Sequence, residues 1–363
     1  MRAAVDNFLR ARRLGLETER RAELASLACH AAQRATRAAS LQVALVYLAS
    51  AAELVAFDAA QTWAEERELC ALYARTLAET SAIALQPADA VPKIRSYIAF
   101  CETRSEKVEM SVLYVRLLQA ANDYVTGINE ALVAVKLAGY DTLNLPDDLR
   151  ADFPASDADL DALERSAFGP APAEPTEEDQ LAHAVTILIG LVGSVSYVML
   201  PDHGKLIFGL ALRLAARYPL AGHSPAIAFI LGMASMSVSR LHKLDYVKAS
   251  VKLAARLVHE RARGSIFFSI GLVTVTAQEH VWKPMKDITY KPAWDSAVRG
   301  GDLSTAAYVL GLDCYTALLC GRLFRENMTP AKAQWFESVS DFQPVGRAWV
   351  PYPPHVSPES RER

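Results

Sequence analysis

The sequence predicts an all-α protein assembled from helical hairpins in two blocks, and three observations support this prediction. Ala, Leu, Arg and Glu dominate the first 140 residues, where Gly and Pro are nearly absent. The alternation of apolar and polar residues that marks β-strands does not occur there. Later in the chain, a short turn pattern recurs that is typical of helical repeats. A hydrophobic content of 52% favours a folded chain over a disordered one.

The first block, residues 1–140, divides into helices of about ten to twenty residues, an ordinary length for helical hairpins. Turn-forming residues mark the expected ends of these helices. The expected breaks are at Leu14-Gly15, near Phe57-Asp58, at Gln86–Asp89, near Glu102–Ser105 and at Asn122-Asp123.

Residues 141–179 differ from the block before them because they are acidic and rich in proline. This composition predicts a surface linker that contains one short helix near Asp157–Ser166. Thr176 and Asp179 have the spacing of an N-terminal capping box, although Asp replaces the usual Glu or Gln, and they predict a helix start.

The second block, residues 180–341, returns to a helical composition. The proline-rich tail at 342–363 is expected to be extended or disordered. Breaks in the second block are expected at Pro201, Pro219–Pro225, Leu241–Asp245, Arg263-Gly264, Pro284–Pro292 and Gly300-Gly301.

The recurring pattern is a turn, an Asp followed by an aromatic residue or Leu, and then a small residue. It occurs at Asn122–Gly127, Leu244–Ala249 and Gly301–Ala306. In helical-pair repeats the turn reverses the chain, the aromatic residue packs under the next hairpin, and the small residue lets two helices touch. The distances between the three segments are not multiples of the 34 residues or so of a tetratricopeptide repeat. The prediction of a tetratricopeptide-like α-solenoid in two blocks therefore rests on the form of the pattern and not on its period.

Further blocks along the chain occur in an order that resembles a known family. They are Ala44–Leu48, Trp63–Glu66, Val135–Gly139, His280–Pro284 and the segment from Gly301 through Leu303 to Tyr308. Over roughly residues 5–325 the chain resembles the helical-repeat region that follows the AAA-type ATPase domain in large signalling proteins. These include multidomain sensor histidine kinases and serine/threonine kinase–ATPase fusions.

The resemblance implies a non-catalytic protein-protein interaction and regulatory scaffold in intracellular signal transduction. Its partners would be other proteins or the adjacent ATPase and kinase domains of a parent architecture. The sequence itself contains no G-x-x-x-x-G-K-[ST] loop, no H-R-D and no D-F-G motif. We therefore expect no catalytic residue and no cofactor.

Charge, cysteine and histidine content bear on nucleic-acid binding, metal binding and the cellular compartment. A net charge of −3 and a pI near 6.3 give no basic field for nucleic acid. The five cysteines have no C-x-x-C spacing, and no secretory signal opens the chain. The histidines lack H-E-x-x-H spacing, so no metal site is expected. These features predict a cytoplasmic protein with reduced, mostly buried thiols.

Two groups of residues are candidates for partner binding. Trp282, Tyr290 and Trp294 could line a groove for a partner segment, or could wedge between neighbouring hairpins as core. Lys248, Lys252 and Arg256 recur every four residues on one helix face, where they could bind an acidic partner or be solvated.

Two alternatives belong to other functional classes. One is an enzyme with a pocket near His280 and Asp302, although an Asp in a Gly-Asp turn more often caps the following helix. The other is a membrane-embedded helical protein, because Leu181–Leu200 contains twenty residues without a formal charge. A helix buried inside a helical array has the same hydropathy, so we expect no membrane contact.

Overall fold

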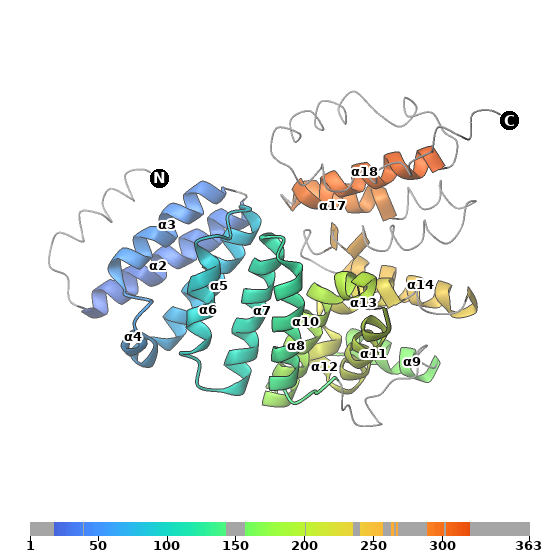
Figure 1. Cartoon of the computed structure of the whole chain (residues 1–363), viewed down its shortest axis with the longest axis horizontal. Coiled ribbons are helices and arrows are strands. Elements are labelled where there is room, and N and C mark those ends of the chain that lie inside the picture. The colour runs from blue at the N-terminus through green and yellow to red at the C-terminus, as the bar shows by residue number, and fades with distance from the viewer. Residues whose placement is uncertain are drawn as a thin grey trace, which may run out of the picture.

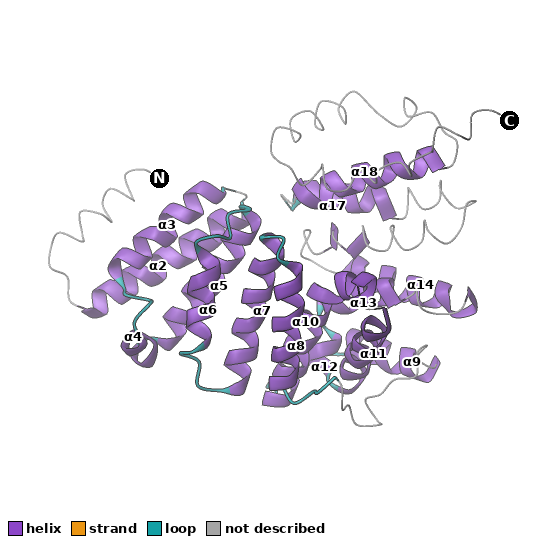
Figure 2. Ribbon diagram, in the orientation of Figure 1, coloured by secondary structure: helices purple, strands orange, loops and turns teal. Residues whose placement is uncertain are grey.

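The computed structural model describes residues 18–38, 40–142, 157–199, 201–234, 240–256, 263–264, 266–267, 289–300 and 303–319. Within these ranges all regular structure is helical and no strand is present (Figure 2). The predicted all-α class is confirmed.

The helices before the acidic segment are α2 (Thr18–Arg37), α3 (Leu41–Leu54), α4 (Ala60–Glu65), α5 (Arg67–Ile83), α6 (Ala90–Ile98), α7 (Arg104–Ala120) and α8 (Tyr124–Leu137). Those that follow are α9 (Asp157–Phe168), α10 (Glu177–Met199), α11 (Pro201–Arg217), α12 (Pro219–Gly222), α13 (Pro225–Ala234), α14 (Arg240–Arg256), α17 (Lys291–Arg299) and α18 (Leu303–Leu319).

Consecutive helices form hairpins, and the hairpins pack in a regular order. The first helices of the hairpins, α2, α5, α7, α10 and α13, each pack against the next one in this series. The second helices, α3, α6, α8 and α11, contact both their own first helix and the first helix of the following hairpin. Figure 1 shows this row from α2 (blue) through α8 (green) to α13, with the α17–α18 hairpin (orange) beside it.

Side-chain caps fix several helix starts at the predicted breaks. The Glu106 amide donates to Thr103 Oγ1 (3.1 Å) and the Thr103 amide donates to Glu106 Oε2 (3.1 Å), which completes a capping box at α7. The Asp179 amide and Thr176 Oγ1 form the equivalent bond at α10 (3.2 Å). Asp123 accepts a bond from the Thr126 amide (3.2 Å) at the start of α8. The predicted breaks near 57, 87, 103 and 122 are therefore confirmed.

The break predicted at Leu241–Asp245 is wrong, because α14 runs through it without interruption. This stretch contains no Gly or Pro, and Tyr246 just after it is fully buried. The lack of a helix-breaking residue and the burial of Tyr246 therefore favour a continuous helix over a turn. The repeated segment at Leu244–Ala249 lies inside a helix, whereas the one at Asn122–Gly127 spans the start of α8.

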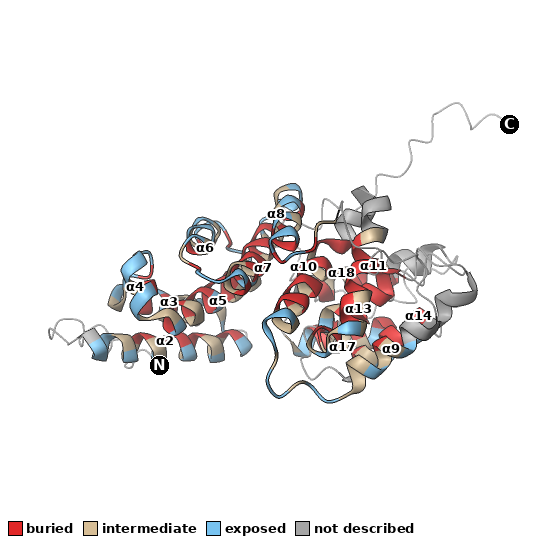
Figure 3. Cartoon of the chain, turned by 90° about the horizontal axis from the view of Figure 1, so that it is seen from below, coloured by how far each residue is buried: buried red, intermediate tan, exposed pale blue. Residues whose placement is uncertain are grey.

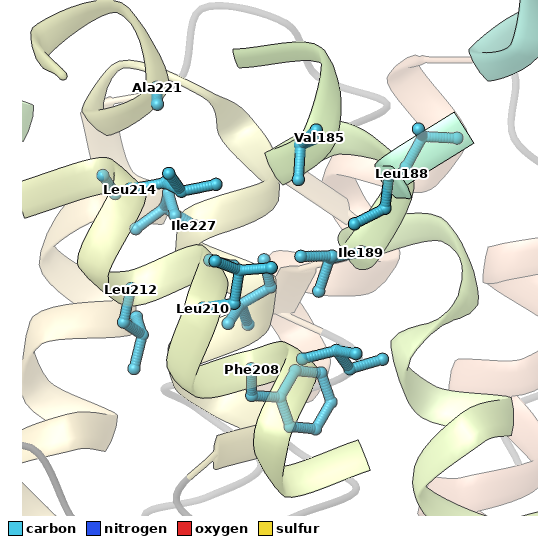
Figure 4. Close-up of a cluster of buried hydrophobic side chains, with 14 of the residues drawn as sticks. Val185, Leu188, Ile189, Phe208, Leu210, Leu212, Leu214, Ala221 and Ile227 are labelled. Carbon is cyan, nitrogen blue, oxygen red and sulfur yellow. The ribbon is translucent and has the colours of Figure 1, made fainter. Parts of the chain in front are cut away.

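Two large clusters of buried side chains meet at helix α7. The N-terminal core joins α2 to α7 and includes Cys29, Leu48, Tyr73, Ile94 and Leu117. The central core joins α7 to α14 and includes Val108, Ile128, Leu163, Leu188 and Phe208. Figure 4 shows some of the side chains that α10, α11, α12 and α13 contribute to the central core. In Figure 3 the buried residues lie where helices meet, and the outward sides of α4, α6 and α8 are exposed.

The central core crosses the predicted 141–179 linker. Ile128 and Val135 of α8 share this core with Leu181 and Leu188 of α10. Residues 157–168 form the short helix that the sequence predicted, but Leu163 is 2% exposed and packs in the same core. The helices on either side of the acidic segment are therefore joined by packed side chains and not by a linker alone.

Three of the five cysteines are free and buried, as expected from the sequence. Cys29 and Cys70 are fully buried between α2 and α5, and burial raises the pKa of each thiol to about 12. Burial raises the pKa of Cys101 to about 11. The side chains of Cys314 and Cys320 lie outside the described part of the chain.

Glycines on α10 allow the backbones of neighbouring helices to approach closely. A Cβ atom at Gly190 would lie 2.7 Å from Ala226 Cβ of α13, closer than real Cβ atoms come. In contrast, a Cβ atom at Gly127 of α8 would lie 3.7 Å from Leu118 Cβ, an ordinary contact. The two positions therefore differ in packing, although both are glycines inside helices.

We predict opposite effects of alanine at these two glycines. Gly127→Ala should stabilise the protein by up to about 1 kcal/mol, the gain in helix propensity. Gly190→Ala should lower the free energy of unfolding by about 1–2 kcal/mol, because overpacking costs about 1–3 kcal/mol and exceeds that gain. Chemical denaturation of the two variants measures both effects. An increase in stability for Gly190→Ala would show that α10 and α13 are not in close contact.

Candidate interaction surfaces

The three aromatic residues of the predicted site have different environments. Tyr290 is 2% exposed and packs in a C-terminal cluster with Ile266, Phe267 and Val309, so it lies in the core and not on a partner-binding surface. Trp294 is half-buried and packs against the same cluster. Trp282 lies outside the described residues. The structure therefore brings Tyr290 and Trp294 together, as a joint between packed elements.

The predicted basic face lies on α14, and part of it is engaged within the chain. Lys248 and Lys252 are exposed. Arg256 is the last residue of α14, and its side chain lies outside the described part of the structure. Lys252 Nζ lies 2.6 Å from Glu164 Oε2 and 4.7 Å from the centre of the Phe168 ring, both on α9. An acidic helix of this chain therefore already contacts the face that we expected to bind an acidic partner.

The two contacts of Lys252 are individually weak. The Lys252 and Glu164 side chains keep 52% and 37% of their exposure, and an exposed ion pair contributes about 0–1 kcal/mol. A cation–π contact at an exposed site adds about 0.5–1 kcal/mol. These contacts orient α9, whereas the burial of Leu163 supplies the larger part of its attachment.

The contact of α9 with α12 also buries a polar atom without a partner. Helix α9 packs against α11 and α12, and a Cβ atom at Gly222 of α12 would approach Ser166 Cβ to 3.0 Å. Ser166 Oγ, which belongs to α9, is buried there and has no hydrogen-bond partner among the described residues. A buried group left unsatisfied costs about 1–3 kcal/mol. The unsatisfied Ser166 hydroxyl therefore opposes the docking of α9.

In the sequence the acidic segment and the basic face are separate features, and the contact of Glu164 with Lys252 spans 88 residues. The available signal was their opposite charge: α9 carries Asp157, Asp159, Asp161 and Glu164, and the α14 face is formed by lysines and Arg256. Glu164 and Phe168 are four residues apart, so both face the same side of α9.

A histidine pair lies where α10 meets α12. His183 Nδ1 of α10 is 3.0 Å from the Leu220 carbonyl oxygen of α12. Burial lowers the pKa of His183, and the nearby His223 lowers it further, while the hydrogen bond to Leu220 opposes the shift. The folded chain therefore favours the neutral imidazole at His183.

Three exposed apolar side chains of α8 form another surface feature. Val125, Val133 and Leu137 are 59%, 64% and 41% exposed. Their spacing of four and eight residues places them along one ridge of the helix.

The structure describes the segment expected of a membrane protein but not the residues of the alternative enzyme pocket. His280 and Asp302 lie outside the described residues, so the geometry of an enzyme pocket there is not defined. Across the described ranges, no helix has the length and apolarity needed to cross a membrane. Leu181, Leu188 and Val192, from the segment in question, instead pack in the central core. The part of the chain that the structure describes contains no cluster of three metal-ligating side chains.

Comparison with known proteins found no matching family model, no matching characterised protein and no matching solved structure.

We predict that His183 makes stability depend on pH. The unfolded chain binds the proton below the ordinary histidine pKa of about 6.5, whereas the folded chain resists it. Stability is therefore complete above about pH 6.5 and falls as the pH decreases through that value. His183→Asn retains a donor for Leu220, so its melting temperature should fall less than that of the wild type between about pH 7.5 and pH 5.5. His30→Asn, at an exposed histidine of α2, should behave as the wild type does. Equal losses in wild type and His183→Asn would contradict this assignment.

Proposed function

We propose that this chain is a tetratricopeptide-like α-solenoid that acts as a non-catalytic interaction and regulatory scaffold in intracellular signalling. The observation that carries this proposal is the packing order, in which each first helix contacts the next first helix and each second helix fits against the following hairpin. Stacked hairpins of this kind bury a continuous core and leave extended outer faces, which solenoid proteins use to bind other proteins.

The identity of the partners rests on the family resemblance. The Ala44–Leu48 and Val135–Gly139 blocks lie in α3 and at the end of α8. Trp63 of a third block is 4% exposed, and its Nε1 donates to the Phe57 carbonyl oxygen (2.8 Å). These blocks support hairpin packing, and we propose that the packed array serves a cytoplasmic ATPase–kinase signalling system, as in the proteins that it resembles.

The contact mechanism that we propose is electrostatic attraction of an acidic partner to the exposed lysines of α14. Lys248 is exposed on α14 beside Lys252, and Trp294 is half-buried in the neighbouring C-terminal cluster. Basic side chains on a rigid helix attract an acidic partner and set its register, while nearby partly buried aromatic rings supply contact area.

Binding of a purified partner tests this proposal. A partner captured with the full-length chain, then purified, should bind saturably at a fixed stoichiometry. Lys248→Glu should weaken that binding at least about tenfold, equivalent to 1.4 kcal/mol, because it reverses the charge on the proposed face. Arg95→Glu is the matched control, at an exposed arginine on α6.

The competing enzyme hypothesis gives a different result. If the purified chain hydrolyses a nucleotide, phosphate ester or carboxylic ester, and Asp302→Asn abolishes that turnover, the scaffold proposal is wrong. Equal partner affinity for wild type and Lys248→Glu would remove α14 from the interaction surface.

A further inference from the structure

We propose that α9 is a built-in ligand. It occupies a surface formed by α11, α12 and Lys252 of α14, and an acidic helix supplied by a partner can take its place. That partner helix would carry one buried leucine and a glutamate followed four residues later by an aromatic residue. The replacement of α9 by a partner helix rests on the proposed scaffold function, and it names the chemistry of one of the scaffold's partners.

The contacts of α9 define what the surface recognises. Among the side chains of α9 that the structure describes, those of residues 161–168, Leu163 is the one in the central core, where it is 2% exposed. Glu164 and Phe168 both converge on Lys252, one through its carboxylate and the other through its ring. The surface therefore recognises an apolar anchor flanked by an acidic and an aromatic group on one helix face.

Charge complementarity favours an acidic helix over other occupants. Helix α9 carries four carboxylates, Asp157, Asp159, Asp161 and Glu164, against one basic residue, Arg165. On α14, Lys252 contacts α9, and the exposed Lys248 lies four residues before it on the same side of the helix. A helix of opposite charge would meet the lysines with repulsion, so the surface discriminates against basic segments.

The attachment of α9 is suited to exchange because its contacts are incomplete. The Lys252 contacts are exposed, and Ser166 Oγ of α9, buried against Gly222 of α12, has no partner among the described residues. When α9 leaves, water can hydrate this oxygen. A partner helix with a small apolar residue at the position of Ser166 would bury no unsatisfied hydroxyl there, whereas α9 does.

The chain that follows α9 allows it to leave without disrupting the next helix. Residues 169–176 form no helix and include Pro170, Pro172 and Pro175. Helix α10 then begins with its own cap, in which Thr176 Oγ1 accepts from the Asp179 amide. The start of α10 is therefore stabilised locally and does not depend on α9.

Replacement of α9 by its own sequence in trans tests the inference. The probe is a labelled peptide of residues 157–169, held helical by a lactam bridge, because an isolated helix of this length is marginal in water. The full-length variant Leu163→Ala/Phe168→Ala weakens the internal copy. We expect the peptide to bind this variant at least about tenfold more tightly than it binds the wild type, because the internal helix no longer competes. A control peptide with Glu164→Lys and Phe168→Ala should not bind.

Equal affinity for wild type and variant, or no binding to a folded variant, would overturn the inference. If the double variant does not fold, hydrogen exchange of the wild type decides the question. Amides of α9 should then exchange at least about tenfold faster than those of α11, and equal protection would overturn the inference. This assay uses only the chain and its own helix sequence, so its failure leaves the partner-binding test of the scaffold proposal unaffected.

Discussion

Burial of α7 on two opposite sides is the constraint on which the rest of the described structure depends. Val108 and Val115 lie in the central core, whereas Leu117 and Leu118 lie in the N-terminal core, all at 4% exposure or less. A helix that contributes to both cores must keep both neighbouring hairpins in register, since sliding against either one exposes apolar side chains. Helix α7 therefore couples the hairpins before it to those after it.

Polar contacts at the N-terminal ends of the first helices reinforce this register. Arg67 at the start of α5 contacts both oxygens of Glu106 at 2.8 Å, and Arg104 of α7 contacts Glu178 of α10 at 2.9 Å. Glu106 also caps α7, and these bonds together lower the pKa of its carboxyl group below the ordinary value although partial burial opposes the shift. Because the cores and these end contacts fix the first helices, the outer faces and α9 can interact without disturbing the array.

The sequence predicts this fold best where the signal is local. The starts of α7, α8 and α10 follow from Thr103, Asp123 and Thr176, because a cap depends only on neighbouring residues. The continuity of α14 through Leu241–Asp245 had a local signal in the absence of Gly and Pro there. The burial of Tyr246 in the central core could not be predicted, since this core is formed by helices from elsewhere in the chain. For the same reason the contact of Glu164 with Lys252, across 88 residues, and the core position of Tyr290 required the structure.

Hydrogen exchange of the Val115→Ala variant tests most directly whether α7 couples the two cores. Val115 is fully buried on the central-core side of α7, so truncation leaves a cavity on that side alone. If α7 transmits the loss, amides of both α5 and α10 will exchange faster than in the wild type. Faster exchange confined to α10, with α5 unchanged, would contradict a single coupled array.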